Sequence, residues 1–302
     1  MPSSEDKWKK WLLEGRFAGA DQKRSLKHLA DLAQTLLGFA RLKESEVLLD
    51  VRAGDGLIAF AALPQLGQTG RVILADISRP LLEHAKALAL EMQLLDRCEF
   101  IETSADKLTP IPDASVDIVT TRSVLIYVQE KRKAFSEFSR VLKPQGRIAL
   151  WEPVHAPWER IGMGFFDDYA VPPITELVRR LSDFYGSLQP PNHDPMLDFD
   201  EWDLVGLAKQ AGFETIIANL SLTILPGIPM KWENFVAFQG NPNIPALSDA
   251  IGQVLSTSER EMLETHMRPL IEQGRGRLRQ AGLFLWAWKP GGWLPERAES
   301  AR

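Results

Sequence analysis

The sequence predicts a doubly wound α/β fold, in which helices cover both faces of a mostly parallel β-sheet. Five short apolar runs lie between residues 47 and 152, and segments with helical periodicity separate them. Apolar runs without polar alternation are typical of strands that are buried on both faces. Regular strand–helix alternation implies parallel strands joined by right-handed crossovers.

The five apolar runs are the predicted strands: 47–51, 71–76, 98–102, 116–121 and 147–152. Three segments between them have a helical pattern: 57–66, 80–92 and 130–142. The second helix has Ser78 as its candidate N-cap and Pro80 in its first turn, and both residue types favour helix initiation there. Two further strands are predicted within 212–225 and at 281–289.

The segments outside this alternation complete the predicted domain organisation. The first 45 residues have helical spacing in two runs, and the glycines around 16–21 predict a hinge that lets the first helix act as a lid. Residues 226–280 are too long for a hairpin turn and are interpreted as an insertion. The predicted parts are a helical lid (1–45), an α/β core (46–153), a helical cap insertion (154–199), a core helix and sixth strand (200–225), a second helical insertion (226–280), and a seventh strand with the tail (281–302).

Composition and charge exclude several classes of protein. The formal net charge is -5, so the chain lacks the basic face on which most nucleic-acid binding depends. No apolar stretch approaches the roughly 20 residues that span a bilayer, and the first residues do not read as a signal peptide. With Cys98 as its one cysteine, the chain is expected in the reducing cytoplasm, without membrane insertion. The five histidines are scattered without ligand spacing, so no metal site is expected.

The stretch Leu48–Gly56, LLDVRAGDG, is the most informative motif in the chain. It reads as a strand that runs into a glycine turn and then a helix, and at such a junction the backbone can approach a ligand closely. Asp76 closes the next predicted strand, where a carboxylate can accept hydrogen bonds from both ribose hydroxyls of an adenosine. Asp50 precedes the turn and can meet an ammonium group, which favours a nucleoside with an amino-acid tail over a pyrophosphate.

These motifs, together with Ser104–Val119 and Val141–Pro153, resemble the class I S-adenosylmethionine-dependent methyltransferases. The chain is most similar to the ubiquinone-biosynthesis-like branch, which methylates small molecules. The resemblance covers residues 45–153 well and the later strands more loosely. It implies a seven-stranded sheet of order 3-2-1-4-5-7-6 with an antiparallel seventh strand, and S-adenosylmethionine as the cofactor.

The resemblance also implies which residues bind the cofactor. The glycine motif falls on Asp50–Gly56, the ribose-binding acid on Asp76, the adenine-contacting loop on Ser104–Asp106 and the loop after the fourth strand on 121–123. The implied cofactor-binding residues are Asp50, Arg52, Ala53, Gly54, Gly56, Asp76, Ile77, Ala105, Asp106, Arg122 and Ser123.

Arg52 departs from the family pattern, because it stands where the family usually has the first glycine of this motif. An arginine disfavours positive φ and brings a cation to the edge of the site. Two interpretations follow. Either Arg52 points outward and has no effect, or its guanidinium binds the carboxylate of the methionine moiety as a charge-assisted pair.

Catalytic residues are harder to predict, because a sulfonium methyl group is already activated and the enzyme mainly supplies in-line positioning, exclusion of water and, for some acceptors, proton removal. The candidates are His155, just beyond the fifth strand, with Tyr127 and Glu152 as expected neighbours. Each is alternatively a hydrogen-bonded structural residue. The tryptophans of the cap segments, Trp202 and Trp232 among them, are expected in the core more often than against a substrate, although an aromatic-rich cap suits a flat or lipophilic acceptor.

Two other functions stay open at this point. The chain could bind S-adenosylmethionine without methylating, as a regulatory protein or a cyclising enzyme. It could also be an NAD-dependent oxidoreductase, because Gly54, Gly56 and Ala59 fit the G-x-G-x-x-A form of a dinucleotide-binding motif. The acceptor and the oligomeric state cannot be predicted from these residues.

Overall fold

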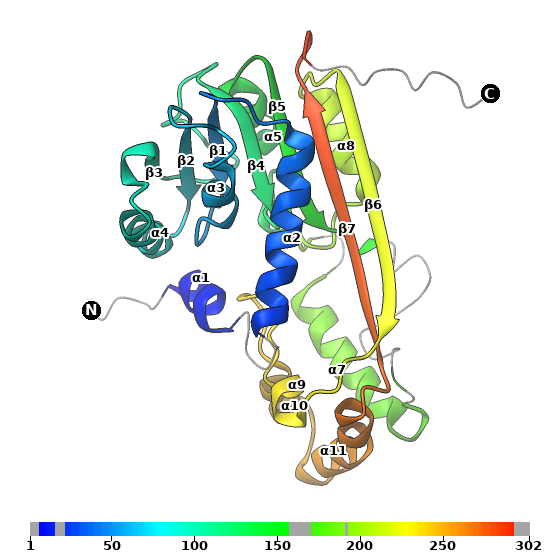
Figure 1. The fold of residues 1–302 in the computed structure, drawn as a ribbon. Coiled ribbons are helices and arrows are strands. Elements are labelled where there is room, and N and C mark those ends of the chain that lie inside the picture. Colours follow the sequence, from blue (N-terminus) through cyan, green and yellow to red (C-terminus); the bar gives the residue numbers. More distant parts are fainter. Residues whose placement is uncertain (1–5, 16–21, 157–168, 170, 191–192, 293–302) are drawn as a thin grey trace, which may run out of the picture. The chain divides into compact units, whose positions relative to one another are not determined.

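A seven-stranded sheet of order β3-β2-β1-β4-β5-β7-β6 forms the centre of the fold in a computed structural model, as the resemblance implied (Figure 1). The structure describes residues 6–15, 22–156, 169, 171–190 and 193–292. β7 runs antiparallel to the other strands. Contacts divide the chain into two compact units: a core unit of Leu32–Glu152, Glu201–Asn219 and Leu283–Arg302, and a cap unit of Met1–Asp31, Pro153–Asp200 and Leu220–Gly282.

The strands follow the apolar runs of the sequence closely. The strands are β1 (Val47–Val51), β2 (Arg71–Asp76), β3 (Cys98–Glu102), β4 (Val116–Arg122), β5 (Leu142–Pro153), β6 (Thr215–Pro226) and β7 (Arg277–Trp288). The first three have the predicted bounds. β5 begins five residues before the predicted 147, because the Pro-x-Gly turn is part of a bulge: pairing with β4 shifts after Val116, and Gln145 has a φ of 65°.

The helices of the core unit lie on both faces of the sheet (Figure 1). They are α3 (Leu57–Ala62), α4 (Arg79–Glu91), α5 (Lys131–Val141), α8 (Glu201–Gln210) and the second half of α2 (Gln22–Ala40). Ser78 caps α4 as predicted, with its hydroxyl accepting from the Leu81 N–H. α3 ends earlier than the predicted 66, since Pro64 has no N–H to continue the helical ladder.

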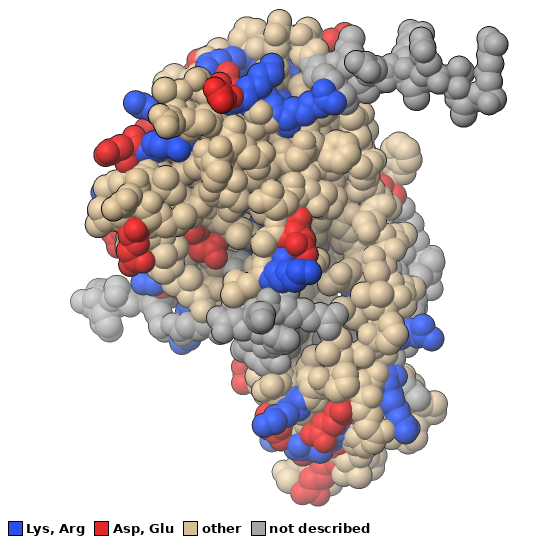
Figure 2. Space-filling model, viewed as in Figure 1, with Lys and Arg blue, Asp and Glu red and all other residues tan. Residues whose placement is uncertain are grey.

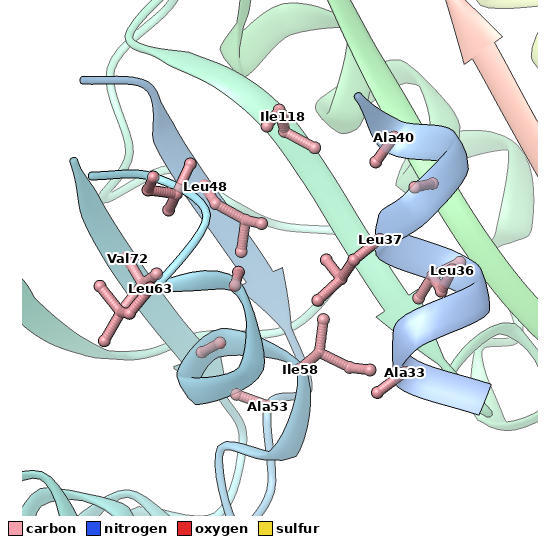
Figure 3. Close-up of a cluster of buried hydrophobic side chains, with 14 of the residues drawn as sticks. Ala33, Leu36, Leu37, Ala40, Leu48, Ala53, Ile58, Leu63, Val72 and Ile118 are labelled. Carbon is pink, nitrogen blue, oxygen red and sulfur yellow. The ribbon is translucent and has the colours of Figure 1, made fainter. Parts of the chain in front are cut away.

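One hydrophobic cluster joins α2 and α3 to one face of the sheet (Figure 3). Leu36 and Leu37 of α2, Ile58 of α3 and Ile118 of β4 are all buried in it. Trp286 of β7 is fully buried beneath α2, and its indole N–H donates to the Leu36 carbonyl at 2.9 Å. A buried indole needs such a partner, so this bond fixes α2 against the sheet.

Arg147 of β5 joins three segments of the core unit. Its guanidinium donates to the carbonyls of Ala40 and Arg41 at the end of α2 and pairs with Glu46 just before β1, at 2.7 Å. Both side chains are largely buried. The C-terminal carbonyls of a helix lack intrahelical partners, so this arginine satisfies groups that α2 leaves open.

The cap unit is helical apart from the parts of β6 and β7 that it contains. Its elements are α1 (Lys7–Lys10), a π-helix (Trp11–Gly15), a 3₁₀-helix (Pro172–Ile174), α7 (Thr175–Leu188), α9 (Trp232–Val236), α10 (Leu247–Val254) and α11 (Thr257–Glu272). α7, α9, α10 and α11 share one hydrophobic cluster, in which Trp232 is buried. Trp202 of α8 is 71% exposed, so the expectation that it belongs to the core was wrong.

Polar contacts hold the cap unit together. The Lys7 ammonium donates to the side-chain oxygen of Asn243, and the Trp11 indole N–H donates to the Gln239 carbonyl. The N-terminal helices therefore contact the second insertion. Arg268 of α11 pairs with several acids, and Figure 2 shows acidic and basic side chains interspersed over this helix. The predicted hinge at 16–21 and the tail after 292 lie outside the described residues, and the lid stays a prediction. Among the described helices, none has the length and apolarity needed to cross a bilayer.

Candidate active site at the carboxyl edge of the sheet

The parallel register brings the predicted site residues of the core unit to one edge of the sheet. Val51 at the end of β1 pairs with Ala75 of β2 on one side and with Thr121 of β4 on the other. Asp76 at the end of β2 pairs with Glu102 at the end of β3. The loops that follow these four strands therefore emerge side by side, and ligands of open α/β sheets bind at this edge.

The loop after β1 has a left-handed backbone at three positions. Arg52, Gly54 and Gly56 have φ angles of 54°, 58° and 82°. Gly56 is required for packing as well, because a β-carbon there would lie 2.4 Å from the ring of Phe60. The conformation leads the chain sharply from β1 into α3 and turns the backbone of residues 52–56 toward the carboxyl edge.

Asp76 connects this loop to β2. Its buried carboxylate accepts hydrogen bonds from the Gly54 N–H at 3.0 Å and from the Ser78 N–H at 2.9 Å. Burial raises the pKa of Asp76, whereas the Ser78 bond and the charge of Arg52 counteract the rise. The backbone N–H of Ile77 also hydrogen-bonds this carboxylate. A carboxylate has about four acceptor sites, so these three protein bonds leave some capacity for a ligand hydroxyl. Ile77 beside it exposes 37% of its surface.

Asp50 was expected to face a ligand ammonium group, and the structure gives its carboxylate two partners within the protein. One oxygen accepts from the Ala59 N–H of α3 at 3.2 Å, and the other from the Thr120 hydroxyl of β4 at 2.9 Å. The side chain is buried, which raises its pKa to about 7. Asp50 thus fastens α3 to β4, and a contact with a ligand stays a prediction.

Arg52 does not point outward into solvent, so the structure disagrees with the first of the two interpretations. Its guanidinium carbon lies 5.7 Å from the centre of the Tyr127 ring. Desolvation lowers the pKa of Arg52, and the charges of Asp76, Tyr127 and Glu152 oppose that change. A cation is therefore held at the carboxyl edge by an aromatic face and by acids.

Glu152, a predicted catalytic residue, is enclosed by backbone donors. Its carboxylate accepts from the N–H groups of Val124 and Leu125 at 2.9 and 3.0 Å and from the Thr121 hydroxyl at 3.0 Å. Burial raises the pKa of Glu152 to about 7. These bonds order the 3₁₀-helix Leu125–Tyr127. Glu152 therefore positions the loop that carries Tyr127.

The remaining predicted residues have less defined roles. Ala53 and Ala105 are buried, Asp106 and Arg122 are half-buried, and the charge of Arg122 lowers the pKa of Asp50.

The loop after β4 also begins under strain, because Ser123 has a φ of 56° while its N–H donates to the Trp151 carbonyl at 2.8 Å. His155 is half-buried and belongs to the cap unit, whereas Tyr127 and Glu152 belong to the core unit, so a catalytic contact among the three stays a prediction. In the described part of the chain, no group of three or more His, Cys, Asp or Glu side chains is arranged to hold a metal ion.

The sequence alone did not point to Thr120 and Phe60, which hold Asp50 and the glycine loop. Both follow from the fold. A threonine inside a buried strand signals that its hydroxyl has a partner, but which partner depends on the neighbouring strand.

Comparison with known proteins favours one of the nucleotide-binding families that such an edge could serve. A family model described as a methyltransferase domain matches residues 49–150, which span β1 to β5. The antiparallel β7 inserted between β5 and β6 also departs from the strand order of dinucleotide-binding folds. The region from β1 to β5 is therefore similar to a methyltransferase domain.

Relatives of the chain include the ubiquinone/menaquinone biosynthesis C-methyltransferase of Escherichia fergusonii, 29% identical over 181 residues that cover 58% of this chain and 69% of the relative. The solved YcgJ protein from Bacillus subtilis aligns with a TM-score of 0.53 at 19% identity, covering 88% of this chain and 100% of YcgJ. The [4+2]-cyclase SpnF aligns with a TM-score of 0.50 at 19% identity, covering 87% and 82%. These two structures show the fold alone.

Proposed function

We propose that this chain is a class I S-adenosylmethionine-dependent methyltransferase and transfers the methyl group of S-adenosylmethionine to an O, N or C atom of a flat or lipophilic small molecule. The observation that carries the proposal is the buried carboxylate of Asp76, which joins the end of β2 to the glycine loop through the Gly54 N–H. The cofactor supplies an electrophilic methyl group when bound. The chain binds and orients the cofactor and the acceptor and excludes water from them, and these effects account for most of the rate enhancement in such a reaction.

The residues at the carboxyl edge fit this cofactor chemically. The remaining acceptor capacity of Asp76 suits a ribose hydroxyl, and the exposed apolar side chain of Ile77 suits the face of an adenine ring. Ala105 and Asp106 follow β3, the neighbour of β2, and are proposed to border the same base. The loop 52–56 brings its backbone close enough to border the methionine moiety.

Arg52 is proposed to bind the carboxylate of that methionine moiety. Its guanidinium has five donors in a planar fork that matches a carboxylate. The left-handed φ of 54° is unfavourable for an arginine, and strain of this kind persists where the surrounding structure enforces it, often at ligand sites. The stacking against Tyr127 holds the guanidinium in place.

The acceptor is proposed to approach near Tyr127 and Ser123, which the Glu152 hydrogen bonds order after β4. Tyr127 and His155 are the candidates for moving a proton from an O or N acceptor, or for removing the ring proton after C-methylation of a phenolate. A carbon acceptor that is already an enolate would need neither. A cytoplasmic location and the absence of nucleic acid as a partner stay part of this proposal.

Isothermal titration calorimetry with S-adenosylmethionine, S-adenosylhomocysteine and NAD tests the cofactor, and mass spectrometry of a panel of phenols, amines and quinol-like enols tests the acceptor. We expect micromolar binding of both adenosyl compounds, no NAD binding, and formation of S-adenosylhomocysteine with at least one acceptor. Binding without turnover across the panel would favour the regulatory or cyclising alternative. Failure to bind either adenosyl compound at high micromolar concentration would end the proposal.

A further inference from the structure

β6 is an edge strand that lacks charged residues and internal prolines, two of the usual protections against pairing. It is the last strand in the sheet order, so its outer edge has no strand beside it among the described residues. Its sequence, TIIANLSLTILP, contains no charged residue, and its single proline is the final residue, Pro226. Natural edge strands are normally guarded by charges, prolines or bulges, because an open row of backbone donors and acceptors pairs with other chains.

The part of β6 in the cap unit also exposes an apolar stripe. Leu220, Leu222 and Ile224 are 38%, 53% and 48% exposed. Side chains alternate between the faces of a strand, so these three project from the same face. Ser221 and Thr223 project from the opposite face. Large apolar side chains exposed in a regular row mark a surface that another chain covers.

We infer that β6 pairs antiparallel with β6 of a second copy of this chain, about a two-fold axis that passes beside Leu222. In this register Leu222 lies opposite Leu222 of the second copy, and Leu220 lies opposite Ile224. On the other face Ser221 lies opposite Thr223, which gives a hydroxyl pair. A two-fold interface must be complementary to itself, and residues 220–224 are: within them apolar residues meet apolar residues, and polar residues meet polar residues. Beyond them Leu225, 40% exposed, lies opposite Asn219, so the matched register is confined to these five residues.

Charge favours a second copy over a charged partner. Each copy carries a formal net charge of -5, so two copies repel wherever their acidic surfaces meet. The uncharged β6 edge is a place where they can approach without bringing like charges together. The paired segment is short, so the interface falls at the small end of specific interfaces and the dimer is expected to depend on protein concentration.

Disulfide trapping tests both the pairing and its register. Residues opposite each other in an antiparallel pair have Cα atoms about 4.5–5.5 Å apart, within the range that a disulfide bridges. In a Cys98→Ser background, Leu222→Cys is expected to form a covalent dimer under mild oxidation. Leu220→Cys alone is not, because its opposite residue is Ile224. The double variant Leu220→Cys, Ile224→Cys is expected to cross-link again.

Sedimentation velocity of the full chain gives a second readout without cysteines. The wild type is expected to shift from monomer to dimer as concentration rises, and Leu222→Lys to stay monomeric, because it places two ammonium groups opposite each other. Leu90→Lys, at a leucine of α4 that is 64% exposed, is the matched control and should dimerise like the wild type. A wild type that stays monomeric, or cross-linking of Leu220→Cys as fast as Leu222→Cys, would overturn the inference.

Discussion

The guanidinium of Arg52 lies over the ring of Tyr127, 5.7 Å from its centre, so the loops after β1 and β4 are joined by a cation–aromatic contact at the carboxyl edge of the sheet. Asp76 adds a nearby negative charge. The arginine is thereby aligned before any ligand arrives, and such alignment reduces the entropy lost on binding.

Replacing Arg52 should separate its role toward the cofactor tail from its effect on folding. Arg52→Gly removes the guanidinium and relieves the left-handed strain, so we expect an unchanged or higher Tm and about tenfold weaker binding of S-adenosylhomocysteine, in line with one charge-assisted pair. Methylthioadenosine, which lacks the amino-acid carboxylate, should bind equally to both proteins. Equal weakening for both ligands would show that Arg52 acts on the loop instead.

Asp76 should dominate binding of the nucleoside moiety. Asp76→Asn keeps one carbonyl oxygen as acceptor but loses the second and the charge, so we expect at least tenfold weaker binding of S-adenosylhomocysteine by calorimetry. Glu102→Gln is the matched control, because Glu102 pairs with Asp76 in register at the end of β3. Equal losses in the two variants would contradict a specific role for Asp76.

The two buried acids should make folding stability depend on pH. Burial raises the pKa of both Asp50 and Glu152 to about 7, whereas the unfolded chain has values near 4. Because these groups bind more protons in the folded state, the stabilisation they give is complete below about pH 4 and is lost as pH rises through about 7. Between pH 5 and pH 8, the free energy of unfolding should fall.

The Thr120 hydroxyl tests this assignment. It donates to the Asp50 carboxylate and lowers its pKa, so Thr120→Val should destabilise by about 1–3 kcal/mol at pH 8 and by clearly less at pH 5, where Asp50 is protonated. Thr175→Val, whose hydroxyl donates only to backbone carbonyls, should cost the same at both pH values. Urea unfolding measures both. A Thr120→Val effect independent of pH would exclude ionisation of Asp50 in this range.

Gly56 should be intolerant of any side chain. Gly56→Ala adds a β-carbon that would meet the Phe60 ring at 2.4 Å and imposes a φ of 82° on an alanine, so we expect a loss of about 2–4 kcal/mol and weaker cofactor binding. Gly212→Ala has a φ of 89° with nothing near its β-carbon, and isolates the backbone cost of about 1–2 kcal/mol. Similar losses of Tm in the two variants would argue against the clash.

Local patterns predicted the strands, because a buried parallel strand must be a continuous apolar run whichever partner it has. β1, β2 and β3 have the predicted bounds, and Asp76 closes β2. The bulge in β5 was not predicted, since a Pro-x-Gly sequence reads as a turn unless the neighbouring strand continues its pairing.

The hydrogen-bond partners of the buried polar side chains could not be predicted from the sequence. Glu152 was a catalytic candidate as an expected neighbour of His155 and Tyr127, and that role stays a prediction. Its hydrogen-bond partners, the N–H groups of residues 124 and 125, come within reach only in the folded loop. The same holds for Arg147, whose bonds to the end of α2 span more than a hundred residues of chain. Hydrogen-bond partners at such separations are a property of the tertiary structure.

The division into core and cap units has an evolutionary consequence. The chain passes from one unit to the other five times, and neither unit corresponds to a continuous stretch of sequence. No single truncation or gene fusion can therefore remove or exchange the cap segments as a block. An exchange of the cap unit would have to replace three separate segments of the chain together.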